Sequence, residues 1–162
     1  MQEKYWNYMV QTKASILYLD IYAEKSYKYD RNINICSAIA SSWSIGAWAV
    51  WEELSFLWGM IIAISQVITA IKEFFPFERR LKLLKPFIED MKMIYIRMEH
   101  DWFRVAEGEL TEREINELLF LYKKDVTAIE SKYSKEEILV ENPEYLEEAD
   151  NRCDIYFKNN FC

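Results

Sequence analysis

Charged residues are absent from two neighbouring stretches in the first half of the chain. Neither Asn32–Trp51 nor Leu54–Ile71 contains an Asp, Glu, Lys or Arg, and only Glu52 and Glu53 separate the two stretches. An α-helix needs roughly 20 mostly apolar residues to cross the hydrocarbon core of a bilayer, and both stretches approach that length. The pattern therefore predicts a helical hairpin, within residues 32–76, that spans a membrane twice and has an acidic tip.

Basic residues flank this hairpin at its two ends and are missing from its tip. They precede the first stretch and follow the second: Lys25, Lys28, Arg31, Lys72, Arg79, Arg80, Lys82 and Lys85. By the positive-inside rule, we expect a multi-pass membrane protein with both ends in the cytoplasm. The alternative, a hairpin buried in a soluble bundle, is disfavoured because a chain of 162 residues has few other helices to cover it.

Polar and small residues recur at helical spacing in both predicted spans. The line in the first span consists of Asn34, Ser37, Ser41 and Ser44, followed by Trp48. Such a line either makes a mildly adhesive helix–helix contact or, where several chains assemble, faces a water-filled path. In the second span, Ser55, Gly59 and Ala63 form a series that allows close packing of helix backbones, with the other span or with a second chain.

Residues 1–31 have the pattern of an amphipathic helix. Positions on one stripe recur every three or four residues: Tyr5, Met9, Thr12, Ile16, Leu19 and Ala23. This pattern predicts that the stripe packs on other helices of the protein, with a membrane-surface position as the alternative.

Residues 77–133 carry two apolar seams of heptad type. The first seam is Phe77, Leu81, Leu84, Ile88, Met91, Tyr95, Met98, Trp102 and Val105, and the second is Ile115, Leu119, Tyr122, Val126, Ile129 and Tyr133. They predict a cytosolic, coiled-coil-like pair of antiparallel helices. Gly108 is expected to separate the two helices, Thr111 and Glu114 to form a capping box, and Pro86 to kink the first helix or begin a new one.

Residues 134–162 form an acidic tail. A short helix is expected around Glu144–Phe157, in a mobile segment whose apolar side chains could dock on the preceding helices: Ile155, Tyr156, Phe157 and Phe161. The four segments together predict an all-α membrane protein. The low content of Gly and Pro, 3 of each, agrees with long helices.

Composition excludes several functions. A net charge of −7 argues against direct nucleic-acid binding, because a phosphate-binding surface is basic. The 3 cysteines show no metal-ligand spacing, and no phosphate-binding loop or nucleophile motif occurs, so we expect no metal, no cofactor and no enzymatic activity. The single histidine, His100, lies among charged residues and is expected to be solvated rather than catalytic.

The order of these segments resembles a known family. An amphipathic helix, a two-span hairpin, an exit sequence Phe74-Phe75-Pro76-Phe77-Glu78-Arg79-Arg80 and two long charged helices are similar in layout to the SLATT family of bacterial membrane proteins, which are associated with nucleotide-signalling defence. The resemblance implies an anti-phage effector of the cell inner membrane that oligomerises and permeabilises this membrane when a sensor protein detects infection. The alternative is a membrane-anchored scaffold whose cytosolic helices or acidic tail bind a partner protein.

Overall fold

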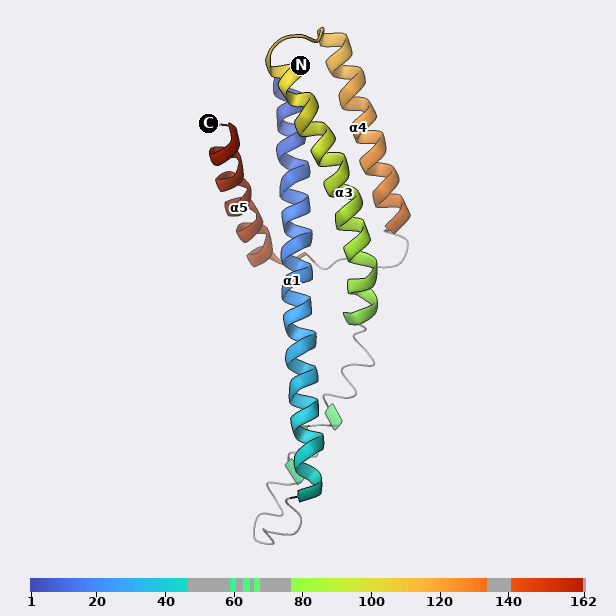
Figure 1. Ribbon diagram of the computed structural model, residues 1–162, viewed down its shortest axis with the longest axis vertical. Coiled ribbons are helices and arrows are strands. Elements are labelled where there is room, and N and C mark those ends of the chain that lie inside the picture. The colour runs from blue at the N-terminus through green and yellow to red at the C-terminus, as the bar shows by residue number, and fades with distance from the viewer. Residues whose placement is uncertain (47–58, 61–62, 65, 68–76, 134–140, 162) are drawn as a thin grey trace. The chain divides into compact units, whose positions relative to one another are not determined.

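The described part of the chain is entirely helical. The computed structural model describes residues 1–46, 59–60, 63–64, 66–67, 77–133 and 141–161 (Figure 1). Within these ranges the long helices are α1 (Gln2–Gly46), α3 (Phe77–Ala106), α4 (Glu112–Tyr133) and α5 (Pro143–Phe161), and no strand occurs. The all-α class predicted from the sequence is therefore confirmed for the described residues.

The chain divides into two compact units. The first unit, called the helical lobe below, consists of Met1–Ala23 and Lys82–Cys162, and the second consists of Glu24–Leu81. Helix α1 contributes residues to both units and does not end at Arg31, where the sequence predicted a boundary. The reason is that residues 32–46 continue without a Pro or an internal Gly that would break the helix.

Consecutive helices in the lobe run antiparallel (Figure 1). Near the start of α1, the side-chain amide of Gln2 donates to the carbonyl of Val105 at 2.7 Å, and the Tyr5 hydroxyl donates to the carbonyl of Met98 at 2.9 Å. Between α3 and α4, Arg97 contacts Asp125 and Asp90 contacts Lys132, each at 3.0 Å, so the two helices pair in opposite directions. The predicted antiparallel pairing of the two seams is confirmed.

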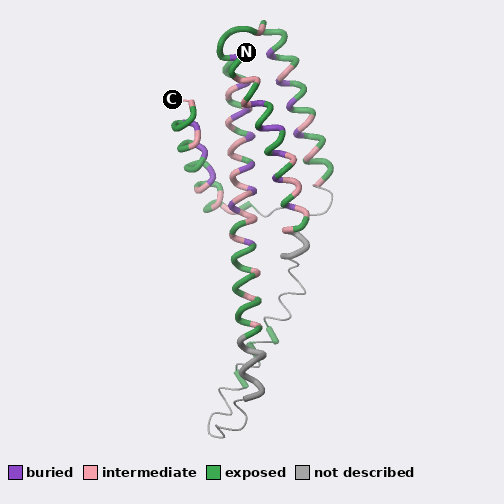
Figure 2. The backbone as a smooth tube through the Cα atoms, in the orientation of Figure 1, coloured by how far each residue is buried: buried purple, intermediate pink, exposed green. Residues whose placement is uncertain are grey.

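One hydrophobic core joins the four helices of the lobe. Its buried members are Tyr5, Met9, Ile16, Met91, Ile94, Tyr95, Met98, Val105, Ile115, Leu119, Tyr122, Val126, Cys153 and Phe157. Figure 2 shows these buried positions repeating along each helix of the lobe. The stripe predicted for residues 1–31 is buried from Tyr5 to Leu19, which confirms that it packs on protein. Each buried large apolar side chain contributes roughly 1.5–3 kcal/mol to folding.

The connection between α3 and α4 follows the sequence signals closely. Gly108 has a positive φ of 75°, which ends α3 in a conformation that glycine adopts at little cost. The Glu114 backbone N–H donates to the Thr111 hydroxyl oxygen at 3.3 Å, and the Thr111 N–H donates to the Glu114 carboxylate at 2.8 Å. The predicted capping box is confirmed.

Pro86 does not begin a new helix. It lies inside α3, which is continuous from Phe77 to Ala106. A proline removes one backbone hydrogen bond from a helix. Here the buried side chains of Leu84 and Ile88, on either side of Pro86, pack in the lobe and stabilise the helical backbone between them. The prediction that Pro86 begins a new helix is therefore wrong.

The predicted acidic tail contains a packed helix. In α5, Ala149, Cys153 and Phe157 are buried, and the partly buried Tyr156 and Phe161 pack against the core. Docking of these aromatic residues is confirmed, whereas Ile155 is exposed. One face of α5 buries apolar side chains in the core, and the charged residues on its other face stay in contact with water. Residues 143–161 are therefore part of the lobe rather than a detached tail.

No helix in the described ranges has both the length and the apolar character that a bilayer crossing requires. Only part of the predicted hairpin lies in those ranges. Residues 32–46 form the end of α1, and the described residues between 59 and 67 are helical. The acidic tip at Glu52 and Glu53 lies outside the described residues, so the transmembrane hairpin stays a prediction.

Candidate functional site

The polar line of the first predicted span lies largely within α1. The continuous helix includes the positions Asn34, Ser37, Ser41 and Ser44. Asn34 is exposed, and its side-chain amide donates to the Asp30 carboxylate at 2.9 Å. Trp48 lies outside the described residues. The water-filled path and the helix–helix contact at this polar line both stay predictions.

The close-packing series of the second predicted span is described at two of its three positions. Gly59 and Ala63 are exposed, and a Cβ added to Gly59 would meet no heavy atom within 4 Å. Ser55 lies outside the described residues. Within the described part of one chain, therefore, no helix approaches Gly59 as closely as such a series allows.

Apolar side chains in both charge-free stretches are uncovered. Ile35, Met60, Ile64 and Val67 are between 49% and 58% exposed. Single exposed apolar residues are common on proteins, but contiguous exposed apolar surface marks contact with another protein or with lipid. These four residues lie in stretches without any charged residue, so they fit such a contact surface.

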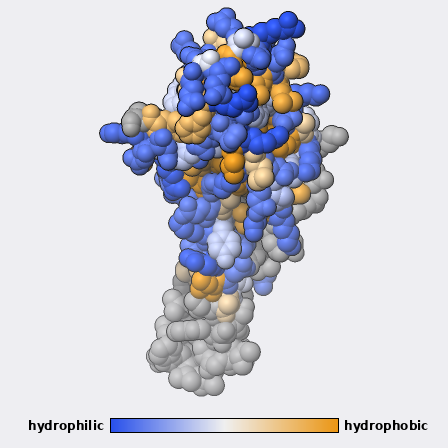
Figure 3. All heavy atoms as spheres, turned by 45° about the horizontal axis from the view of Figure 1, so that its top comes forward, coloured by the Kyte–Doolittle hydropathy of each residue, from blue (hydrophilic) through white to orange (hydrophobic). Residues whose placement is uncertain are grey.

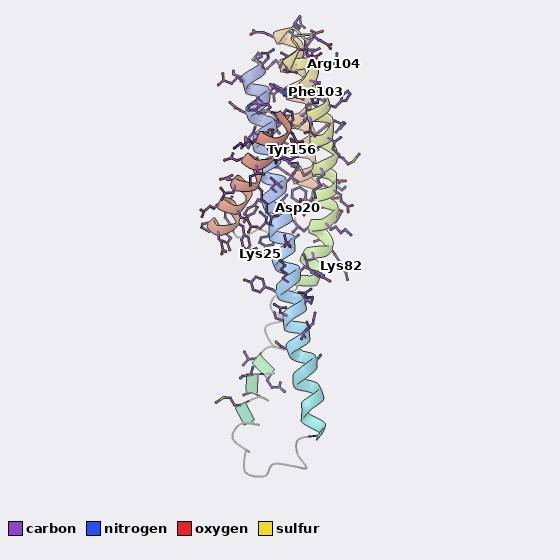
Figure 4. All side chains as sticks on the ribbon, turned by 60° about the vertical axis from the view of Figure 1, so that its left-hand side comes forward. Asp20, Lys25, Lys82, Phe103, Arg104 and Tyr156 are labelled. Atoms are coloured by element: carbon purple, nitrogen blue, oxygen red, sulfur yellow. The ribbon has the colours of Figure 1, made fainter. Side chains whose placement is uncertain are left out.

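The lobe contains a polar cluster that the sequence did not predict, called the α5 cluster below. Its members are Lys13 of α1, Tyr95 and Glu99 of α3, and Cys153 and Tyr156 of α5. The Lys13 ammonium lies 3.6 Å from the ring centroid of Tyr156 and 4.6 Å from that of Tyr95. The Tyr156 hydroxyl donates to the Glu99 carboxylate. Figure 4 shows Tyr156 on the α5 side of this junction.

Burial dominates the electrostatics of the α5 cluster. It lowers the pKa of Lys13, and it raises the pKa of Tyr156 to about 12 together with the hydrogen bond to Glu99. Burial likewise raises the pKa of Tyr95, whose hydroxyl oxygen has no hydrogen-bond partner among the described residues. The raised pKa of the Cys153 thiol keeps it protonated and unreactive. The cluster therefore fastens α5 to α1 and α3 and offers no activated nucleophile.

A second polar network connects α3 and α4. The Tyr122 hydroxyl donates to the Asp101 carboxylate at 2.7 Å, and burial followed by this bond raises the pKa of Tyr122. His100 is exposed, with its Nδ1 atom 3.4 Å from the Asp101 carboxylate. The prediction of a solvated histidine is confirmed. In the part of the chain that the structure describes, no three His, Cys, Asp or Glu side chains gather as a metal site would require.

In comparisons with known proteins, no family model, no curated protein and no solved structure matches this chain. The layout shared with the SLATT family thus stays a resemblance read from the sequence.

Proposed function

We propose that this protein is an effector of the bacterial inner membrane that assembles into homo-oligomers and forms a pore or disrupts the bilayer. The observation that carries the proposal is the exposure of Ile35, Met60, Ile64 and Val67 within stretches that contain no charged residue. Lipid or a second copy of the chain would cover these side chains, and the hydrophobic effect favours both.

Oligomerisation is a requirement of this proposal. A single two-helix hairpin cannot enclose water, so several copies must surround any aqueous path. The line Asn34, Ser37, Ser41 and Ser44 would supply hydrogen-bonding groups along that path. The exposed series at Gly59 and Ala63 would allow neighbouring hairpins to approach closely.

The setting of this activity follows from the flanking charges and from the resemblance. Both ends of the chain would lie in the cytoplasm, where the helical lobe could meet a sensor or regulatory protein. In this proposal the trigger is an infection signal passed on by that partner, in anti-phage defence. Catalysis has no part in the activity.

The test is release of an encapsulated dye from liposomes of bacterial lipid by the purified full-length chain. We expect release by the parent protein and a large reduction by Ser41→Leu, which replaces a hydroxyl of the polar line with an apolar side chain. Ser15→Leu is the matched control because Ser15 is an exposed serine on α1 outside the predicted span. Absence of release in every oligomeric state, or equal release by Ser41→Leu, would contradict a pore.

A second candidate is a membrane-anchored scaffold. The observation that favours it is apolar exposure in the lobe itself, where Met93 is 63% exposed and Phe120 is 69% exposed. Figure 3 shows apolar patches among hydrophilic residues on one face. Replacing residues 32–71 with an unrelated two-span anchor separates the candidates, because a scaffold keeps its function and a pore loses it.

A further inference from the structure

The face of α4 that points away from the core carries two large apolar residues. Ile115, Leu119, Tyr122 and Val126 are buried on the inner face of the helix. Phe120 and Leu121 lie on the opposite side and are 69% and 49% exposed. We call the surface formed by these two residues and their neighbours Glu117, Lys123 and Lys124 the α4 outer face.

A hollow adjoins Phe120 on one flank of α4, between the outer face and the buried side. It has a volume of about 370 Å³, and its lining residues all belong to α4: Asn116, Glu117, Leu119, Phe120 and Lys123. A shallow depression with an aromatic side chain at its edge suits an aromatic ring from another molecule, because offset ring pairs are favourable beyond the area that they bury.

Two exposed residues of opposite charge flank the apolar pair of α4 at equal distances. Glu117 lies three positions before Phe120, and Lys124 lies three positions after Leu121. Glu117 also pairs with Arg113 of its own helix at 3.1 Å, at an exposed site where such an ion pair is weak. Other charges after Phe120 are engaged within the chain, since Lys123 lies over the Tyr8 ring at 5.4 Å and Asp125 pairs with Arg97. In a second, antiparallel copy of α4, Glu117 of one copy is therefore complementary to Lys124 of the other.

We propose that the α4 outer face is a homodimer surface on which two copies of α4 pack antiparallel about a two-fold axis near Phe120 and Leu121. Residues at equal distances from the axis then face each other. Glu117 of one copy lies opposite Lys124 of the other, and this pairing occurs twice because the interface is isologous. Each Phe120 enters the hollow of the opposite copy.

A second copy fits this face better than an unrelated protein does. The acidic and basic positions flank the apolar pair at matching distances within one helix, which a different partner would not require. On α3, the exposed Phe103 already stacks on Phe161 of the same chain, with ring centroids 6.3 Å apart. The inference deepens the proposed function and rests on it for the role of the dimer.

The first test is the oligomeric mass of the full-length chain in detergent as a function of concentration. We expect Phe120→Glu to raise the concentration needed for half-dimerisation at least about tenfold, the effect of losing one central contact. Glu117→Lys should weaken dimerisation, and the double variant Glu117→Lys with Lys124→Glu should recover much of it. Ile155→Glu controls for an added charge at an exposed large apolar residue outside this face.

The second test locates the two-fold axis by cross-linking in cells. With Cys36, Cys153 and Cys162 replaced by serine, Leu121→Cys should form a covalent dimer on oxidation. Thr127→Cys should not, because two copies of residue 127 lie at opposite ends of the paired helices. Cross-links from position 121 to a different protein, or dimerisation indifferent to Phe120→Glu, would overturn the proposal.

These outcomes are separable from those of the liposome test. If the dimer fails to form while dye release persists, the α4 interface is wrong and the membrane proposal stands. If the dimer forms as described and no release occurs, the interface stands and the proposed function falls.

Discussion

Tyr156 of α5 donates a hydrogen bond to Oε1 of Glu99 on α3, and 57 positions of sequence separate the two residues. The Lys13 ammonium of α1 lies over the ring of the same tyrosine. Tyr156 thus contacts α3 through its hydroxyl group and α1 through the face of its ring. This arrangement satisfies a carboxylate and a cation at the edge of the core, where leaving either without a partner is costly.

Replacing Tyr156 with phenylalanine should destabilise the lobe while preserving its shape. The ring stays under Lys13, but Glu99 loses its donor, and a hydrogen bond to a charged group is worth about 1.5–3 kcal/mol. We expect a loss of roughly this size in the free energy of unfolding, measured by denaturant titration of the full-length chain. Tyr27→Phe is the matched control, because Tyr27 is 60% exposed. Equal stability of both variants would contradict a structural role for the bond.

Alkaline pH should unfold the lobe through its buried phenols. The pKa of Tyr156 is raised from 10.0 to about 12, so the folded chain holds this proton more tightly than the unfolded chain does. Its contribution is fully present below pH 10.0 and is lost as the pH rises through about 12. The measurement is stability against pH, and Tyr156→Phe should flatten the decline in this window. An unchanged slope would show that other groups cause it.

Cys153 should resist thiol reagents as long as α5 is docked. Its side chain is buried and its Sγ atom lies 3.7 Å from the Val10 carbonyl oxygen. In a chain with Cys36 and Cys162 replaced by serine, labelling should be slow and should accelerate strongly in Phe157→Ala, which removes about 3–5 kcal/mol of core packing. The control is Ile155→Ala on the exposed side of α5. Fast labelling of the parent chain would place Cys153 at the surface.

Thr111→Ala should weaken the start of α4. The substitution removes the hydroxyl that accepts from the Glu114 N–H and leaves that backbone group without its cap. We expect a loss of about 1 kcal/mol in the free energy of unfolding, with faster amide hydrogen exchange at residues 112–115. Thr127→Ala is the control, because Thr127 is exposed within the same helix. Unchanged exchange at the start of α4 would argue against the capping box.

Local signals accounted for much of the lobe. The seam from Ile115 to Val126 predicted the buried face of α4, and Gly108 with Thr111 predicted the connection before it. Such features depend on residues within one or two turns of each other, so periodicity and capping chemistry are enough to find them.

The α5 cluster could not be predicted in the same way. Lys13 is separated from Tyr95 and Tyr156 by long stretches of sequence, and only the packing of three helices brings them together. Tyr95 belongs to an apolar seam, and the spacing of that seam gives no indication that polar groups lie near its hydroxyl. The prediction that Pro86 begins a new helix is wrong for a related reason. Tertiary packing of the side chains on both sides of Pro86 stabilises the helix by more than the lost backbone hydrogen bond costs.

The contact of the first helix with α5 has a consequence for biosynthesis. Trp6 packs against Phe157 and Phe161, with ring centroids 5.0 Å and 5.4 Å apart. Helix α5 follows α1, α3 and α4 in the chain. The aromatic residues of α5 that pack on Trp6 are therefore synthesised after the other helices of the lobe. Until then Trp6 has the ring of Trp102 beside it, with centroids 4.8 Å apart, but the side that α5 covers stays accessible to chaperones and proteases.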